Sequence, residues 1–167
     1  MKLVIWLAAI SFVAGSVVFY VMASRAPSKA EGAIKFGSAP HYTVQDVRDL
    51  IERHPAVAAR IVVPGLFPLD LIFLLCLGVF VGSISLLIAP HAAVPVDPWL
   101  LLIFPILYMI GDFTENCLVA WILNSKPEGI TNAQLAAAKM ATWLKIGFLT
   151  AANIQVVALL LGWALRR

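Results

Sequence analysis

The sequence has 167 residues, of which 62% are hydrophobic and 13% are charged. Typical soluble domains are about half apolar and a quarter charged, so this composition argues against a soluble globular domain and for a lipid bilayer as the solvent. The net charge of +3 is spread over the polar segments, without the basic patch that is typical of nucleic-acid binding.

Four apolar segments are each long enough for the roughly 20 residues that a membrane-spanning helix needs. They cover residues 3–22, 66–89, 99–124 and 132–165. The first could be a signal peptide, but its apolar run is longer than the usual core of about 7–15 residues, so we expect a retained helix. The sequence therefore predicts an all-α fold: one transmembrane domain over residues 1–167, an integral membrane four-helix bundle in the cell (inner) membrane.

The segment between the first two predicted helices is long for a simple connection. Residues 25–40 are rich in Gly, Pro and small side chains and predict flexible chain. Residues 43–54 predict a short amphipathic helix, with Thr43 as its N-cap and Pro55 ending it. This helix would lie on the membrane surface, cap the bundle, or act as a linker that packs against nothing. We expect the rings of His41, Tyr42 and His54 to be solvated.

Lys and Arg are concentrated in the segments at residues 23–65 and 124–140. If all four helices cross, both segments lie on one side of the membrane and the two termini lie on the other. The positive-inside rule then predicts cytoplasmic loops and external termini.

The third apolar segment carries a polar stripe. Asp112, Glu115 and Asn116 are spaced i, i+3 and i+4, which brings them to one face of a helix, and Tyr108 joins that face one turn earlier. Lipid cannot solvate such groups, so the stripe must face the interior of the bundle.

The neighbouring helices carry polar residues that can meet this stripe. Asp70 follows Pro64 and Pro68 at the start of the second helix, and Lys145 lies in the last helix. Trp143 and Asn153, on the same helix as Lys145, are predicted to line the same pocket.

The depths of these residues follow from the rise of about 1.5 Å per residue of an α-helix. Asp70, Glu115, Asn116 and Lys145 are expected in the same half of the bilayer, with Asp112 deepest. Three acids facing one lysine leave an excess of negative charge, so we expect at least one neutral acid at pH 7.

Proline, glycine and cysteine complete the sequence-based expectations. Pro105 is expected to kink the third helix. Gly78 with Gly82, and Gly147 with Ala151, form small-xxx-small pairs that are expected to pack within the bundle. Cys76 and Cys117 lack C-x-x-C spacing and are expected to be buried free thiols.

Three features together support a family resemblance: "PLD" at Asp70, "DFTEN" from Asp112, and the lone Lys145 on the last helix. With them, the stretch from residue 42 to residue 165 resembles a group of uncharacterised small four-helix bacterial membrane proteins. The resemblance implies a four-helix fold and nothing about activity.

Function is predicted from the polar cluster alone. Ionisable groups secluded in a membrane are typical of acid–base chemistry or binding, here on a lipophilic small molecule or lipid. Asp112, Glu115 and Lys145 are the candidate catalytic residues. The candidate ligand-binding residues are Asp70, Tyr108, Asn116, Trp143 and Asn153.

Two alternatives stay open: a structural or assembly subunit of a membrane complex, and a proton or ion pathway. The residues leave open whether the protein is an enzyme. The expected partners are membrane lipids, a lipophilic ligand, and a second copy of the chain or a partner membrane subunit, with no nucleic acid. No cofactor is predicted, and no metal site either, since no His lies within the last three apolar segments.

Overall fold

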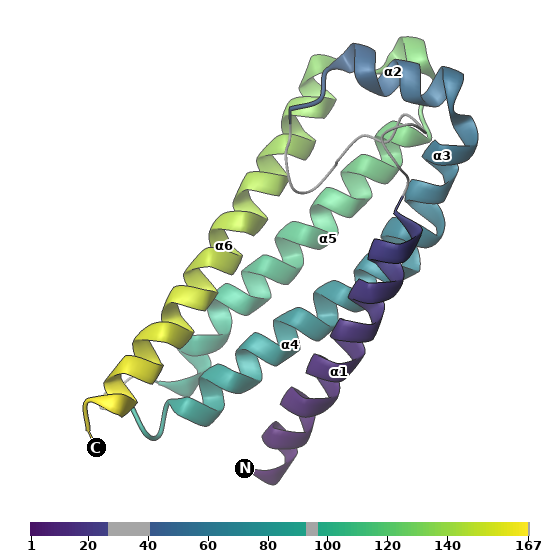
Figure 1. Cartoon of the computed structure of the whole chain (residues 1–167). Coiled ribbons are helices and arrows are strands. Elements are labelled where there is room, and N and C mark those ends of the chain that lie inside the picture. The colour runs from purple at the N-terminus through teal and green to yellow at the C-terminus, as the bar shows by residue number, and fades with distance from the viewer. Residues whose placement is uncertain (27–40, 93–96, 167) are drawn as a thin grey trace.

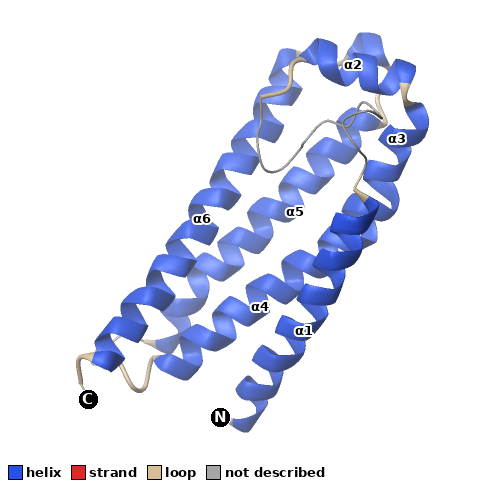
Figure 2. Cartoon of the chain, in the orientation of Figure 1, coloured by secondary structure: helices blue, strands red, loops and turns tan. Residues whose placement is uncertain are grey.

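The structure is a computed structural model that describes residues 1–26, 41–92 and 97–166. Within these residues every regular element is a helix (Figure 2). The helices are α1 (Lys2–Arg25), α2 (Val44–Arg53), α3 (Pro55–Arg60), α4 (Leu71–Ile88), α5 (Ile103–Leu123) and α6 (Asn132–Ala164). Four stretches are long and apolar enough to cross a membrane: Lys2–Arg25, Pro55–Ile88, Pro98–Leu123 and Asn132–Ala164. The predicted all-α fold with four long apolar helices is confirmed.

The four long helices run side by side, and both chain ends lie at the same end of the molecule (Figure 1). α4, α5 and α6 pack against one another, whereas α1 packs along α4 and the segment that precedes α4. Tilted ring pairs join α1 to α4, with centroids 5.5 Å apart for Phe12 and Phe80 and 5.9 Å apart for Phe19 and Phe73. The interior of the bundle is therefore made by three helices, and α1 covers one outer side of α4.

The helices α2 and α6 begin with the same local pattern, "YTVQDV" and "ITNAQL". Thr43 and Thr131 are the N-caps, and each accepts a hydrogen bond from the backbone N–H three residues later. The side chains of Asp46 and Gln134 in turn accept from the backbone N–H groups of the two threonines, at 2.6 and 2.8 Å. Each start is thus a complete capping box, which satisfies N–H groups that a helix end leaves open.

The stabilisation that the Asp46 carboxylate contributes to the start of α2 depends on pH. Hydrogen bonds from the Thr43 backbone and hydroxyl lower the pKa of Asp46 below its ordinary value. Because the folded-state pKa is depressed, this stabilisation is fully present above the ordinary pKa of an aspartate. It is lost as the pH falls through the lowered pKa.

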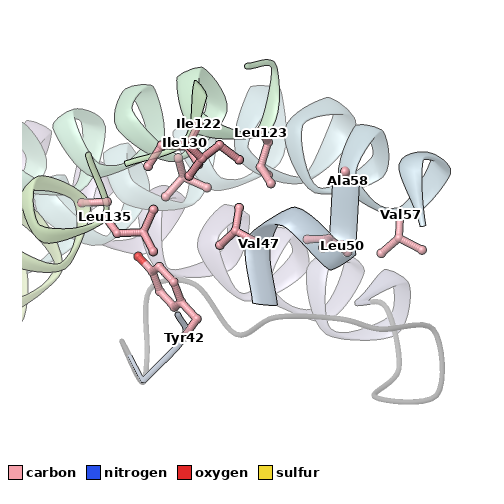
Figure 3. Packing of buried hydrophobic residues seen from close by; sticks show 11 residues of the cluster. Tyr42, Val47, Leu50, Val57, Ala58, Ile122, Leu123, Ile130 and Leu135 are labelled. Carbon is pink, nitrogen blue, oxygen red and sulfur yellow. The ribbon is translucent and has the colours of Figure 1, made fainter. Parts of the chain in front are cut away.

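The residues that flank the two capping boxes form hydrophobic staples, in which the residue before the N-cap packs with the fifth residue after it. Tyr42 pairs with Val47 in this way, and Ile130 pairs with Leu135. Both staples belong to one buried cluster, which we call the cap cluster (Figure 3). Its members are Tyr42, Val47, Leu50, Val57, Ala58, Val119, Ile122, Leu123, Ile130, Leu135 and Ala138.

α2 lies across one end of the bundle (Figure 1). Val47 and Leu50 are 0% and 2% exposed beneath it, and the Arg48 guanidinium donates to the carbonyl oxygens of Pro127 and Ile130, at 2.9 and 3.1 Å. Of the three interpretations of this helix, the linker that packs against nothing is wrong. α2 caps the bundle.

The expectation that the Tyr42 ring is solvated is wrong, because the ring is buried. Burial, followed by the nearby Glu115 carboxyl group, raises the pKa of Tyr42 to about 12. The Lys139 Nζ lies 5.0 Å from the centroid of the ring, within the range of a cation–π contact. The phenol therefore lies between the capped end and the acids deeper in the bundle.

The flexible chain predicted for residues 25–40 falls, from residue 27 on, outside the described residues.

The chain enters α4 through an irregular, proline-interrupted helix at Ile61–Asp70. Val63 and Phe67, each directly before a proline, have extended backbone angles, as the residue before proline favours. Regular helix begins at Leu71 instead of the predicted residue 66, and Asp70 therefore lies at the junction.

Gly78 and Gly82 pack closely against α5 and the residues just before it, as expected. A Cβ on Gly78 would overlap Met109 of α5, and one on Gly82 would lie 3.1 Å from a Leu102 methyl group. Gly147 does not: it is exposed, and no heavy atom lies within 4 Å of an added Cβ. The prediction that Gly147 packs inside the bundle is wrong.

Pro105 and Cys117 also differ from their predictions. Pro105 lies in the first turn of α5, directly after a short 3₁₀ helix at Pro98–Leu102, so its missing N–H falls at a helix start rather than mid-helix. Cys117 is a free thiol as expected, but it is exposed on the outer face of α5, whereas Cys76 is half-buried.

Candidate functional site

The inward face of α5 is polar over two turns. Asp112, Glu115 and Asn116 are each 2% exposed and Tyr108 is 4% exposed. The i, i+3, i+4 spacing predicted this common face, and the structure turns it toward α4 and α6.

Lys145 of α6 joins the two acids of this face. Its Nζ lies 2.6 Å from Asp112 Oδ1 and also forms an ion pair with Glu115 Oε2. All three side chains are largely withdrawn from the surface, with 15% exposure for the lysine and 3% and 2% for the acids. One ammonium group thus bridges two carboxyl groups one turn apart on the neighbouring helix.

One carboxyl oxygen of each acid in the cluster bonds to a neutral group. Tyr108 Oη donates to Asp112 Oδ2 at 3.2 Å, and the Asn116 amide donates to Asp70 Oδ2 of the segment before α4 at 2.8 Å. Thr142 Oγ1 lies 2.6 Å from Glu115 Oε1. These groups, Asp70, Tyr108, Asp112, Glu115, Asn116, Thr142 and Lys145, are called the buried cluster below.

The buried cluster contains three acids and one lysine. In the described part of the chain, the Lys145 ammonium group forms ion pairs with Asp112 and Glu115, whereas Asp70 accepts a hydrogen bond from the neutral amide of Asn116. Charges in an apolar interior are costly unless they are compensated, so protons or a bound cation must balance the excess. The cluster is therefore suited to holding and exchanging protons.

Two residues predicted for the pocket lie outside it. Trp143 is 59% exposed, and Asn153 is exposed with its amide bonded to the Leu149 carbonyl of its own helix at 2.8 Å. The reason is helical register: Trp143 is two residues from Lys145, a spacing that puts side chains on different faces. Asn153 directly follows Ala152, which occupies the buried stripe.

Thr142 and Gln155 are the polar residues of α6 that do face inward. Thr142 is 0% exposed and lies three residues before Lys145. Gln155 lies between the buried Ala152 and Leu159, at spacings of three and four. Helical register would have selected both positions, because Thr142 lies three residues before Lys145 and Gln155 lies seven plus three residues after it, and steps of three, four or seven residues stay on one face.

Gln155 ties three elements together at the end of the bundle away from α2. Its Nε2 donates to Ser85 Oγ of α4 at 3.0 Å and to the Leu101 carbonyl oxygen at 2.9 Å. Ser85 is 0% exposed, and the apolar side chains of Ile88, Leu101 and Leu159 pack nearby. This tie fixes the start of α5, and with it the height of the polar face on α5.

Apolar packing separates the buried cluster from the capped end. Val119 and Ala138, which belong to the cap cluster, lie one turn beyond Glu115 and Thr142 on their helices. The buried side chains of the cap cluster therefore cover the buried cluster at this end and keep it away from water. Seclusion strengthens every electrostatic interaction inside the cluster.

Gly111 sets the approach of α5 to α6 at Lys145. A Cβ at Gly111 would lie 3.3 Å from Lys145 Cβ and 3.4 Å from its backbone Cα and N. We expect Gly111→Val to lower the free energy of unfolding by about 1–3 kcal/mol, because the larger side chain overpacks against backbone that cannot rotate away. Gly147→Val is the matched control, since it places the same side chain in open space. Melting in mild detergent measures both, and equal losses would contradict the close approach.

Among the described residues, no group of three or more His, Cys, Asp or Glu side chains is arranged to hold a metal ion. No protein-family model matches the chain, and no curated protein or solved structure is significantly similar to it. The function must therefore be argued from the cluster itself.

Proposed function

We propose that the protein is a multi-pass protein of the cell (inner) membrane whose buried cluster binds a lipophilic small molecule or lipid and performs acid–base chemistry on it. The observation that carries this proposal is the bridge of Lys145 between Asp112 and Glu115 at the centre of an apolar bundle. Acids and a lysine in one secluded site are what proton transfer requires.

Membrane insertion is supported by the outward faces of the long helices. Large apolar side chains are exposed along α1, α5 and α6, and Trp6, Trp99 and Trp121 are exposed near helix ends, where aromatic residues favour the membrane–water boundary. In water such surfaces would aggregate, whereas in lipid they are solvated.

Cys117 offers a direct test of insertion. It is exposed on α5, roughly 9 Å before the end of that helix by the usual rise per residue. A thiol in hydrocarbon does not ionise, and only the thiolate reacts with a maleimide. In a Cys76→Ser background, we expect a charged maleimide to leave Cys117 unlabelled in opened membrane vesicles and to label it after denaturation.

The control for this labelling is a Glu128→Cys variant that also carries Cys76→Ser and Cys117→Ser. Glu128 is exposed in the short connection before α6, so its replacement should label readily. Labelling of Cys117 at the same rate as this loop position would contradict insertion of α5.

The structural alternative also has an observation in its favour. Lys145 ties α6 to α5, and the Asn116–Asp70 bond ties α5 to the entry of α4, so the cluster links three helices. Interhelical polar contacts in membranes average only about 0.6 kcal/mol, however, and uncharged side chains would provide them without the cost of burying charge.

The ligand proposal is tested by mass spectrometry of organic extracts from the purified protein. We expect at least one lipophilic compound to be enriched in the wild type and lost with Glu115→Gln. Glu128→Gln, the same chemical change at an exposed loop position, should retain the compound. Identical extracts from all three proteins would contradict a bound lipophilic molecule that depends on Glu115.

A further inference from the structure

Apolar packing covers the buried cluster at both ends of the bundle. At one end, α2 and the cap cluster lie over it. At the other end, the side chains of Ile88, Leu101 and Leu159 are buried together beside the hydrogen bonds of Gln155. In the described part of the chain, a molecule that reaches the cluster is therefore expected to come from the side of the bundle rather than along its axis.

Two members of the buried cluster are less buried than the others. Asp70 is half-buried and the Lys145 side chain is 15% exposed, whereas the polar residues of the α5 face are almost completely buried. Both residues lie near the middle of apolar stretches that are long enough to cross a membrane, Pro55–Ile88 and Asn132–Ala164. In a bilayer, the accessible edge of the cluster therefore faces hydrocarbon and not water.

The helices that carry these two residues separate toward the capped end. Gln155 of α6 is bonded to Ser85 of α4 at 3.0 Å near the opposite end. From there α4 and α6 diverge toward α2, with α5 between them in the view of Figure 1. Asp70 and Lys145 belong to the diverging part, and the two side chains interact electrostatically. A head group that enters from the side would meet both residues first.

Both residues keep hydrogen-bonding capacity that no described residue uses. Lys145 Nζ carries three hydrogens and forms ion pairs with Asp112 and Glu115, which leaves one hydrogen. Asp70 accepts from the Asn116 amide at Oδ2, which leaves Oδ1 as an acceptor. The accessible edge of the cluster thus offers one donor and one acceptor to a ligand.

A hydroxyl group matches this pair, because it donates one hydrogen and accepts at its oxygen. It can donate to Asp70 and accept from Lys145. A carboxylate head group has no hydrogen for Asp70 and adds an anion beside three acids. An ammonium head group has no acceptor for Lys145 and adds a second cation beside it. An uncharged head group is also the least costly of the three to bring into hydrocarbon.

We propose that the ligand of the buried cluster is a lipid alcohol, which enters from the bilayer between the entry of α4 and α6. Its hydroxyl group lies at Asp70 and Lys145, and its hydrocarbon chain stays in contact with lipid. The inference rests on the proposed function, which supplies the membrane and the binding of a lipophilic molecule. Asp70 and Lys145 then select the head group, as a few well-placed polar groups do in apolar sites.

Photocrosslinking in phosphatidylcholine vesicles tests this proposal. Three probes share one long alkyl chain with a diazirine near the head and differ only in the head group, which is a hydroxyl, a carboxylate or a methyl group. Peptide mass spectrometry locates the adducts. We expect the hydroxyl probe to modify the peptides around Asp70 and Lys145, and an excess of unlabelled hexadecanol to remove most of these adducts. Adducts on the outer face of α1, which would contact bulk lipid, should persist.

The other two probes test the head group. We expect neither to give adducts near Asp70 and Lys145 that hexadecanol removes. A site that bonds a hydroxyl group rejects an analogue without it, because its buried polar groups are then left unpaired. Equal hexadecanol-sensitive labelling by the carboxylate or the methyl probe would overturn the lipid alcohol.

Asp70→Asn tests the acceptor, because it can place an amide donor where the ligand hydroxyl has to donate. We expect the hexadecanol-sensitive adducts of the hydroxyl probe to be lost. Asp49→Asn is the matched control, since it makes the same change at the surface of α2, where Asp49 lies 4.0 Å from Arg53. It should keep these adducts. Circular dichroism and melting report the folding of both variants separately.

Three further outcomes would overturn the proposal: no hexadecanol-sensitive adducts in the wild type, such adducts confined to α2 or to the end near Gln155, or their retention in Asp70→Asn. If Asp70→Asn is not recovered as folded protein, the three probes on the wild type decide the question.

This inference and the proposed function fail in different ways. A Glu115-dependent compound without a hydroxyl group in the organic extracts would overturn the lipid alcohol alone. Identical extracts from wild type and Glu115→Gln, together with no hexadecanol-sensitive adducts from any probe, would overturn both.

Discussion

Replacing Lys145 with methionine is expected to lower the free energy of unfolding in mild detergent by about 3–5 kcal/mol. Methionine nearly keeps the volume of the lysine stem but leaves Asp112 without its cation, in a site where both acids are 2–3% exposed. Uncompensated buried charge, rather than the loss of one attractive contact, accounts for most of this cost. Thermal and denaturant unfolding, followed by circular dichroism, measure it.

Lys126→Met is the matched control, since Lys126 is exposed in the connection between α5 and α6. We expect its melting temperature to stay near that of the wild type. If Lys145→Met melted like Lys126→Met, the ion pairs that Lys145 forms between α6 and α5 would contribute nothing to stability, and the expectation would be contradicted.

Leu50→Ala is expected to cost about 2–5 kcal/mol, as large-to-small substitutions in well-packed cores do. Leu50 is 2% exposed in the cap cluster, where α2 covers the ends of α5 and α6. The loss should be greatest at the capped end. Hydrogen exchange should therefore show reduced protection in α2 and in the first turns of α6, with the end near Gln155 unchanged.

Leu144→Ala is the control for this substitution, because Leu144 is 49% exposed on the outer face of α6. Removing the same atoms there leaves no cavity inside the bundle. Equal destabilisation by the two variants, or unchanged protection of α2 in Leu50→Ala, would contradict the role of α2 as a packed cap.

The sequence predicted the polar face of α5 because several polar residues at helical spacing stand out in an apolar helix. The sequence of α6 indicates its inward face less clearly. Lys145 marks its inward face, but Trp143 and Asn153, which were predicted to line the same pocket, do not share its helical register. Both lie on other faces, while Thr142, at the correct spacing, is buried against Glu115. Position along the helix was the more reliable guide to the site.

Local chemistry explains the remaining differences. Tyr42 was expected to be solvated as one of several loop rings, yet its place directly before the N-cap Thr43 makes it half of a hydrophobic staple. At the entry of α4, Pro64 and Pro68 delay regular helix to Leu71 because each constrains the residue before it. The packing of α1 along α4 and the segment before α4 depends on tertiary contacts that an evenly apolar helix does not encode.

We propose that the charges of the buried cluster are kept for chemistry and not to hold the helices together. The most direct test is the melting temperature of the variant that combines Asp112→Asn, Glu115→Gln and Lys145→Met, compared with Lys145→Met alone. Neutral groups of similar size remove the burden of buried charge, and functional sites commonly reduce stability. We expect the triple variant to melt at or above the wild-type temperature. Melting as low as that of Lys145→Met alone would show that the charged network itself stabilises the bundle, and would contradict the proposal that its charges are kept for chemistry.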